Sequence, residues 1–117
     1  LRMPKDTPEQ QTARNARMQE GLKTAARIPL KTMKMADQAW DAMSEVARCG
    51  NIACKSDIQV GARALETGIW GAYQNVCINA EGIQDQAFKK KTLKEAQTIA
   101  ERAEKKCALV LKILANR

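Results

Sequence analysis

Histidine is absent from this chain of 117 residues, and aromatic side chains make up only 3% of it. Histidine is the commonest catalytic base near neutral pH and the commonest nitrogen ligand of metals. Its absence excludes Ser-His-Asp catalysis, Cys-His catalysis and His-zinc sites within the chain. The few aromatic residues, together with abundant Ala, Lys and Gln, disfavour strands and favour helices. The composition therefore argues against an all-β fold and predicts an all-α protein.

Long apolar runs are also absent. No segment approaches the roughly 20 apolar residues that a membrane-spanning helix needs. The first residues carry Arg2, Lys5 and Asp6 and lack the apolar centre of a signal peptide. We therefore expect no transmembrane segment and a soluble, cytoplasmic protein.

The four cysteines are Cys49, Cys54, Cys77 and Cys107. In a cytoplasmic protein we expect them to be reduced. Only the first two lie close together in sequence, so a zinc site would have to recruit the others from helix interiors. We expect small buried thiols and no metal; Cys54 is the best candidate for a reactive thiolate.

Basic residues outnumber acidic ones by 20 to 13, which gives a formal net charge of +7. Such a charge favours nucleic acid, anionic lipid or an acidic ligand tail. A lysine cluster lies on the first turns of the last predicted helix: Lys89, Lys90, Lys91 and Lys94. It either forms a solvated helix face or attracts the acidic tail of a ligand. We expect no nucleic-acid partner, because only Phe88 adjoins the cluster and no known nucleic-acid-binding motif is present.

The first half of the chain predicts two helices. Thr7, Pro8 and Gln10 form a start signal for a helix from Pro8 to about Arg27. Proline disfavours helical geometry in the residue before it, so we expect a break at Ile28-Pro29 and a second helix from Pro29 to Cys49. That helix should bury Leu30, Met33, Trp40, Met43 and Ala47 and end at Gly50.

The third predicted helix begins at Ser56 or Asp57, either of which can cap it, and ends near Asn79. One face should enter the core through Ile58, Leu65, Ile69, Val76 and Cys77. The other carries small and polar residues at helical spacing: Asp57, Gly61, Ala64, Gly68, Gly71, Asn75 and Asn79. Each interior glycine costs roughly 0.5–1 kcal/mol relative to alanine. We expect either another backbone or a ligand to fill this groove.

A fourth helix of about thirty residues should begin after the cap Asp85. Apolar and small residues recur along it at alternating spacings of three and four: Leu93, Ala96, Ala100, Ala103, Cys107, Val110 and Leu114. This seam predicts packing along a bundle partner, or alternatively a coiled coil or an oligomer contact. The expected fold is an all-α helical bundle of about four helices with one long C-terminal helix.

The groove on the third helix is the one candidate chemical site. Asp57 is either a structural helix cap or, if buried against apolar surface, a general acid. Asn75 and Asn79 lie one turn apart, and their amides either serve packing or recognise a planar heterocycle with amide-like edges.

The segment Cys49-Gly50-Asn51-Ile52-Ala53-Cys54-Lys55-Ser56-Asp57 resembles the cyclodeaminase domain of the formimidoyltransferase-cyclodeaminase family and its bacterial methenyltetrahydrofolate cyclohydrolase-type relatives. The resemblance continues through Gly71-Ala72-Tyr73, Asn75-Val76 and Ile78-Asn79. It also covers Leu1 to Thr7, Gln19-Glu20-Gly21-Leu22 and Ile28-Pro29-Leu30. It implies a helical bundle that dimerises and binds folate near the subunit interface.

The family's reaction closes 5-formiminotetrahydrofolate to 5,10-methenyltetrahydrofolate and releases ammonia, a late step of histidine breakdown. The resemblance implies Asp57 as the catalytic acid/base and Asn51, Ser56, Asn75 and Asn79 as substrate-orienting residues. The folate is the substrate, and no metal is required. The lysine cluster would then attract the polyglutamate tail of the folate.

One part of the family pattern is missing, a Pro-Gly-Gly-Gly-Ser segment of the folate site. We therefore expect residues 1–117 to be the C-terminal portion of a cyclodeaminase domain, inactive in isolation. Its expected partners are the N-terminal part of the domain, a formimidoyltransferase domain and further copies of itself. The alternative is a non-catalytic helical interaction module; the family's association with Golgi membranes and the cytoskeleton leaves it open.

Overall fold

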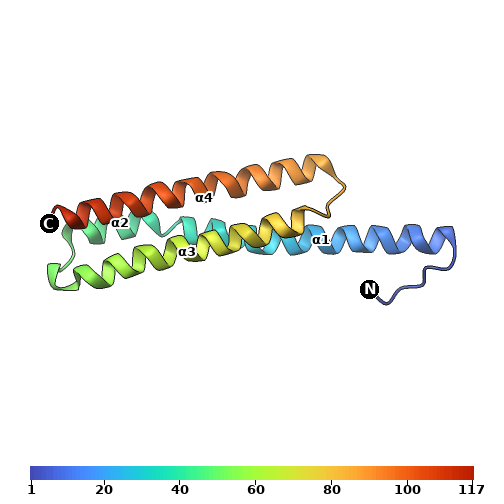
Figure 1. Ribbon diagram of the computed structural model, residues 1–117, viewed down its shortest axis with the longest axis horizontal. Helices are drawn as coiled ribbons and strands as arrows, with labels where there is room; N and C mark the ends of the chain where they lie inside the picture. Colours follow the sequence, from blue (N-terminus) through green and yellow to red (C-terminus); the bar gives the residue numbers. More distant parts are fainter.

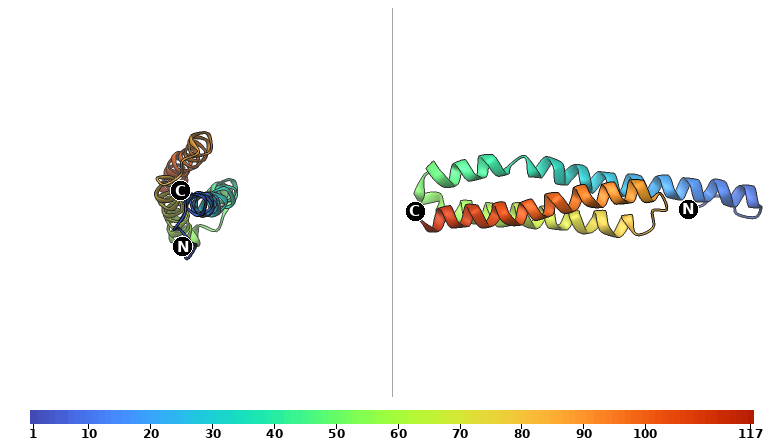
Figure 2. Two further views of the ribbon diagram at one scale, coloured as in Figure 1. Left: turned by 90° about the vertical axis from the view of Figure 1, so that its right-hand side faces the viewer. Right: turned by 90° about the horizontal axis from the view of Figure 1, so that it is seen from above.

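The computed structural model describes all 117 residues and contains helices but no strands. The helices are α1 (Pro8–Asp37), α2 (Trp40–Cys49), a 3-10 turn η1 (Ile52–Cys54), α3 (Lys55–Ala80) and α4 (Gln86–Ala115). Because α2 continues the direction of α1, the four α-helices form three long rods (Figures 1 and 2). The molecule measures 68 × 25 × 16 Å. The predicted all-α bundle is confirmed, and no helix is long and apolar enough to cross a membrane.

α1 begins where the sequence predicts and continues past the predicted break. The Thr7 hydroxyl accepts a hydrogen bond from the Gln10 amide at 3.1 Å, and the Gln10 side chain accepts from the Thr7 amide at 3.2 Å. The break at Pro29 was wrong, since Pro29 lies inside α1. Burial of Ala26 and Leu30 on either side holds the helix against α3, and this packing outweighs the local preference of proline.

The interruption lies ten residues further on, at Gln38 and Ala39. Their amides donate to the carbonyls of Met35 and Ala36, in a tightened turn between α1 and α2. The next residue, Trp40, is only 1% exposed. The sequence signal for this turn is weak because no proline or glycine marks it. α2 ends before Gly50, as predicted.

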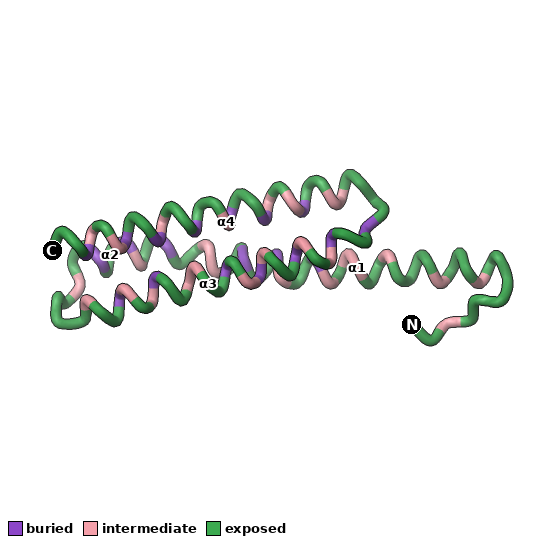
Figure 3. The backbone as a smooth tube through the Cα atoms, in the orientation of Figure 1, coloured by how far each residue is buried: buried purple, intermediate pink, exposed green.

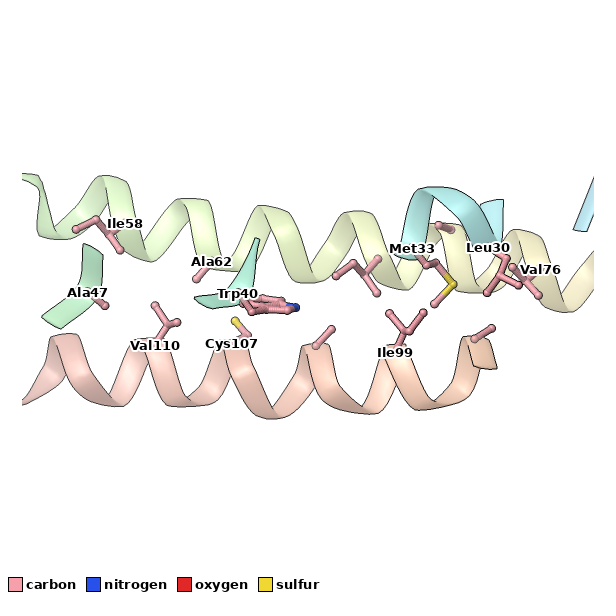
Figure 4. Packing of buried hydrophobic residues seen from close by; sticks show 14 of the residues in the cluster. Leu30, Met33, Trp40, Ala47, Ile58, Ala62, Val76, Ile99, Cys107 and Val110 are labelled. Atoms are coloured by element: carbon pink, nitrogen blue, oxygen red, sulfur yellow. The ribbon is translucent and has the colours of Figure 1, made fainter. Parts of the chain in front are cut away.

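The core lies where α1–α2, α3 and α4 face one another. In Figure 4, Trp40 lies flat between Ala62 of α3 and Cys107 of α4. The seam predicted for α4 is confirmed, since all its members are buried or half-buried. The cap Asp85 is confirmed too, because its carboxylate accepts from the Phe88 amide at 3.1 Å. Beyond the core, the start of α1 projects past the bundle and is mostly exposed (Figure 3).

The turn between α3 and α4 is tied to α1. The Gln19 side chain donates to the Gly82 carbonyl at 3.0 Å and accepts from the Gln84 amide at 2.9 Å. Lys23 pairs with Asp85 at 3.0 Å. These contacts fix the height at which α3 lies along α1, and so they position the groove described next.

Candidate functional site

A groove between α1 and α3, about 440 Å³ in volume, contains two of the predicted site residues. Its walls are Ala25, Ile28, Pro29 and Thr32 of α1 and Ala72, Asn75 and Asn79 of α3. Pro29 has no backbone N–H, so the carbonyl of Ala25 lacks the donor that residue 29 gives in an ordinary helix. The groove therefore combines two carboxamides with a weakly satisfied backbone acceptor.

The two asparagines of this groove are linked to each other. The Asn79 side-chain nitrogen donates to the Asn75 carbonyl at 2.8 Å. This bond fixes the Asn79 amide and leaves its oxygen free to accept. Asn75 is exposed, with its full carboxamide available. Together they offer donors and acceptors to the edge of a planar heterocycle.

The remaining predicted residues lie at the opposite end of α3. Asn51 caps η1, and its side-chain oxygen accepts from the Ala53 amide at 3.0 Å. Ser56 and Asp57 lie in the first turn of α3. The prediction that one of them caps the helix was wrong, because Cys54 occupies the cap position without a side-chain bond. Asp57 is exposed, so the buried-acid alternative does not hold in a single chain.

Asp57 lies far along α3 from Asn75 and Asn79. Asp57 and Asn75 are 18 positions apart on one straight helix, which at 1.5 Å per residue is about 27 Å. A single copy therefore brings Asn75 and Asn79 together and leaves Asp57 far from both.

The small-residue face of α3 is open along most of its length. A Cβ atom added at Gly68 or Gly71 would have no neighbour within 4 Å, and at Gly61 it would meet only Met43 at 3.5 Å. No other part of the chain packs closely on the two central glycines. The core face of α3 is as predicted, with Ile58, Ile69 and Val76 buried.

The lysine cluster divides at the start of α4. Lys91 and Lys94 line a second groove of about 530 Å³, beside Lys34 and Arg102, whereas Lys89 and Lys90 do not. Lys34 pairs with Glu95 at 3.0 Å, and Arg102 makes two 2.9 Å bonds to Asp37. These bonds to Asp37 raise the pKa of Arg102. Lys91 and Lys94 are therefore the two unpaired cations of this groove.

The cysteines are all free. Cys107 is a buried thiol, as predicted, and burial together with a hydrogen bond to Glu66 raises its pKa to about 11. Cys49 and Cys54 are exposed, which the sequence did not predict. No three Cys, Asp or Glu side chains gather closely enough to hold a metal ion.

Comparison with known proteins shows the family to which the chain belongs. The sequence profile of the family described as "Formiminotransferase-cyclodeaminase" matches residues 1–98. The chain belongs to the formiminotransferase-cyclodeaminase family.

Within this family, the chain is similar to the formimidoyltransferase-cyclodeaminases of Rattus norvegicus and Gallus gallus. It is 45% identical to the first over 95% of its length and 42% identical to the second over all of it. It is also 38% identical, over 81% of its length, to a methenyltetrahydrofolate cyclohydrolase of Methylorubrum extorquens. The chain spans 20% and 22% of the first two relatives and 46% of the third.

Several residues that line the two grooves were not predicted from the sequence. Pro29 was interpreted as a helix break, yet it lines the groove. Ile28 and Thr32 line the same groove from α1, and their spacing of four residues, one helical turn, could have indicated that they share a face with Pro29. Lys34 and Arg102 join the lysine cluster only through tertiary contact, for which the sequence holds no local signal.

Proposed function

We propose that this chain is the folate-binding part of a formimidoyltetrahydrofolate cyclodeaminase, an ammonia-lyase, and that its site is completed by a second copy of the chain. Family membership supports the folate substrate. The proposal that a second copy completes the site rests on one observation, the uncharged and open outer face of α3.

That face is unlike an ordinary solvated helix surface. Between Ile58 and Ala80, α3 carries only two charged residues, Arg63 and Glu66, and they pair with each other at 3.6 Å. Val60 is 68% exposed and Ile78 is 65% exposed. A helix with so few charges on every side is normally buried. We infer that a second α3 packs against it.

An antiparallel pairing of two α3 helices suits the sequence. If Val60 of one copy faces Ile78 of the other, the two-fold axis lies level with Gly68 to Gly71. Small residues there let two backbones approach closely. The outer face of one α3 is about 30 Å long, so adjoining parts of α1 are needed to reach the roughly 800 Å² per partner of a typical stable interface.

This register joins the separated residues. Asp57 of one copy then lies about 3 Å along the helix axis from Asn79 of the other, by the helix rise. A two-fold axis keeps equivalent stripes on the same edge of an interface. Asp57 and Asn75 share one stripe of α3, so Asp57 of one copy faces the groove of the other. Two such sites form in each dimer.

The chemistry of ring closure suits this set of groups. One folate nitrogen attacks the formimino carbon and forms a tetrahedral aminal, and the C–N bond to the former imino nitrogen then breaks. The attacking nitrogen loses a proton, and the departing nitrogen must gain one to leave as ammonia. A single carboxylate between them can carry that proton, which is the role proposed for Asp57. Asn75 and Asn79 would hold the pterin edge.

The second groove supplies a place for the acidic tail of the substrate. Lys91 and Lys94 are unpaired there, beside Lys34 and Arg102. We propose that they attract glutamate carboxylates. Exposed charges are screened by salt, so this contribution should weaken between low and physiological ionic strength.

Titration with folinic acid tests the proposal. Binding is followed by tryptophan fluorescence for the chain alone and with the N-terminal part of the cyclodeaminase domain of a relative. We expect Asn75→Ala with Asn79→Ala to weaken binding at least tenfold, and Asn15→Ala with Asn116→Ala, outside the groove, to leave it unchanged. Binding under neither condition, from a helical chain, would overturn the folate proposal and favour the interaction module.

The catalytic role of Asp57 has to be tested in an active enzyme. Asp57→Asn in a complete enzyme carrying this sequence should retain folinic acid binding and lower the rate of ammonia release at least a hundredfold. Full activity in this variant would remove Asp57 from the mechanism.

A further inference from the structure

The opposite edge of α3 carries a feature that folate binding does not use. A groove of about 470 Å³ runs between α3 and α4 and is lined by Glu66, Trp70 and Tyr73 from α3 and by Gln97, Glu101 and Glu104 from α4. We call it the Trp70 groove. Trp70 is 61% exposed. A large aromatic ring left in water beside a groove is typical of the anchors of protein interfaces.

The charge of the Trp70 groove is opposite to that of the molecule. The chain has a net charge of +7, yet three carboxylates meet here. Glu66 pairs with Arg63 at 3.6 Å. Glu101 accepts a hydrogen bond from Gln97 at 3.0 Å but takes part in no ion pair, and neither does Glu104.

The carboxylates of the Trp70 groove also contribute to the raised pKa values of two nearby groups, Cys107 and Tyr73. The carboxylate of Glu66 contributes, after burial, to the raised pKa of Cys107. Glu101 acts in the same direction on the pKa of Tyr73, for which burial is the main cause. In both cases burial is the larger cause, and the smaller contribution has the sign expected from carboxylates at this groove.

We propose that the Trp70 groove docks a basic segment of another protein, with an arginine side chain entering between Trp70 and the carboxylates of Glu101 and Glu104. We choose a basic occupant because its positive charge complements the carboxylates of the groove. Guanidinium is planar, stacks on indole and forms paired hydrogen bonds with carboxylates, so arginine suits the groove better than lysine. The volume accommodates one or two side chains and leaves the remainder of the segment along the surface.

The experiment measures the anisotropy of a fluorescein-labelled hexa-arginine amide titrated with the whole chain. We expect saturable binding, several-fold tighter than that of hexa-lysine, and none of hexa-glutamate. Trp70→Ala, and separately Glu101→Gln with Glu104→Gln, should each weaken it at least tenfold. The matched control is Glu9→Gln with Glu81→Gln, which removes the same charge from exposed sites outside the groove and should change the affinity less than twofold.

Circular dichroism establishes that each variant keeps its helices. Equal weakening by the control pair would show that only overall charge matters and would overturn the proposal. So would binding of arginine amide as tight as that of the peptide, because the groove would then serve a small cation and not a protein segment. Loss of self-association in the groove variants, with peptide binding unchanged, would assign the groove to a second copy of the chain and also contradict the proposal.

Discussion

Replacing Gly68 and Gly71 by alanine should stabilise the single chain. Both glycines lie inside α3, and an added Cβ at either would have no neighbour within 4 Å. Each replacement gains the difference in helix propensity, roughly 0.5–1 kcal/mol, so the pair should contribute about 1–2 kcal/mol. For a domain of this size, that corresponds to an increase in Tm of roughly 5–10 °C.

The assay is thermal unfolding followed by circular dichroism, at a concentration low enough for the chain to be monomeric. Gly50→Ala is the contrasting variant, because its Cβ would lie 2.5 Å from the Val46 carbonyl oxygen and should destabilise the chain. A lower Tm for the Gly68 and Gly71 double variant would refute the reasoning, because it would mean that something in the single chain packs on this face. At high concentration, Gly71→Arg should instead suppress self-association by blocking the approach of a second α3.

Three further predictions concern the core, the α4 cap and the dimer. Trp40→Ala should cost about 3–5 kcal/mol of unfolding free energy in urea titrations, because the indole is 1% exposed and fills the space between α3 and α4; a loss below about 1 kcal/mol would contradict this packing. The pKa of Asp85 is lowered by the Phe88 amide and then by Lys23, so its contribution to stability is present above the unfolded pKa near 3.8 and is lost as the pH falls below it. Asp85→Asn should therefore flatten the dependence of Tm on pH in that range, and an unchanged profile would remove Asp85 from the acid response. A spin label at Ser56, in a chain whose exposed Cys49 and Cys54 are serines, should give a distance between copies of about 40 Å for the antiparallel register, from the helix rise; a distance near 15 Å would mean a parallel pairing.

Much of the fold follows from local signals in the sequence. The Thr7 capping box, Gly50, Asp85 and the apolar seam of α4 each have a short-range cause, and each is where the sequence predicts. Pro29 shows the limit of such reasoning. Its local preference is real, but burial on either side of it is worth more, and that burial depends on α3, which is distant in sequence.

The site could be predicted only in part, for a related reason. Asn75 and Asn79 meet because they lie one turn apart, which the sequence determines. The sequence groups Asp57 with them by helical phase, but phase gives no distance along the helix, and about 27 Å separates Asp57 from Asn75. No intrachain contact covers Gly68 and Gly71, so the prediction that another backbone or a ligand fills this face stays a prediction.

The central claim, that the folate site takes Asp57 from one copy and Asn75 and Asn79 from another, is tested most directly by mixing two variants. One carries Asp57→Arg, which places a bulky side chain at the site, and the other carries Asn75→Ala with Asn79→Ala. Folinic acid binding is measured under the condition in which the unaltered chain binds. Each variant alone should bind at least tenfold more weakly than the unaltered chain. An equal mixture should recover about a quarter of the tight sites, because half of the dimers are mixed and each of these has one intact site. No recovery after the copies have exchanged would contradict the shared site.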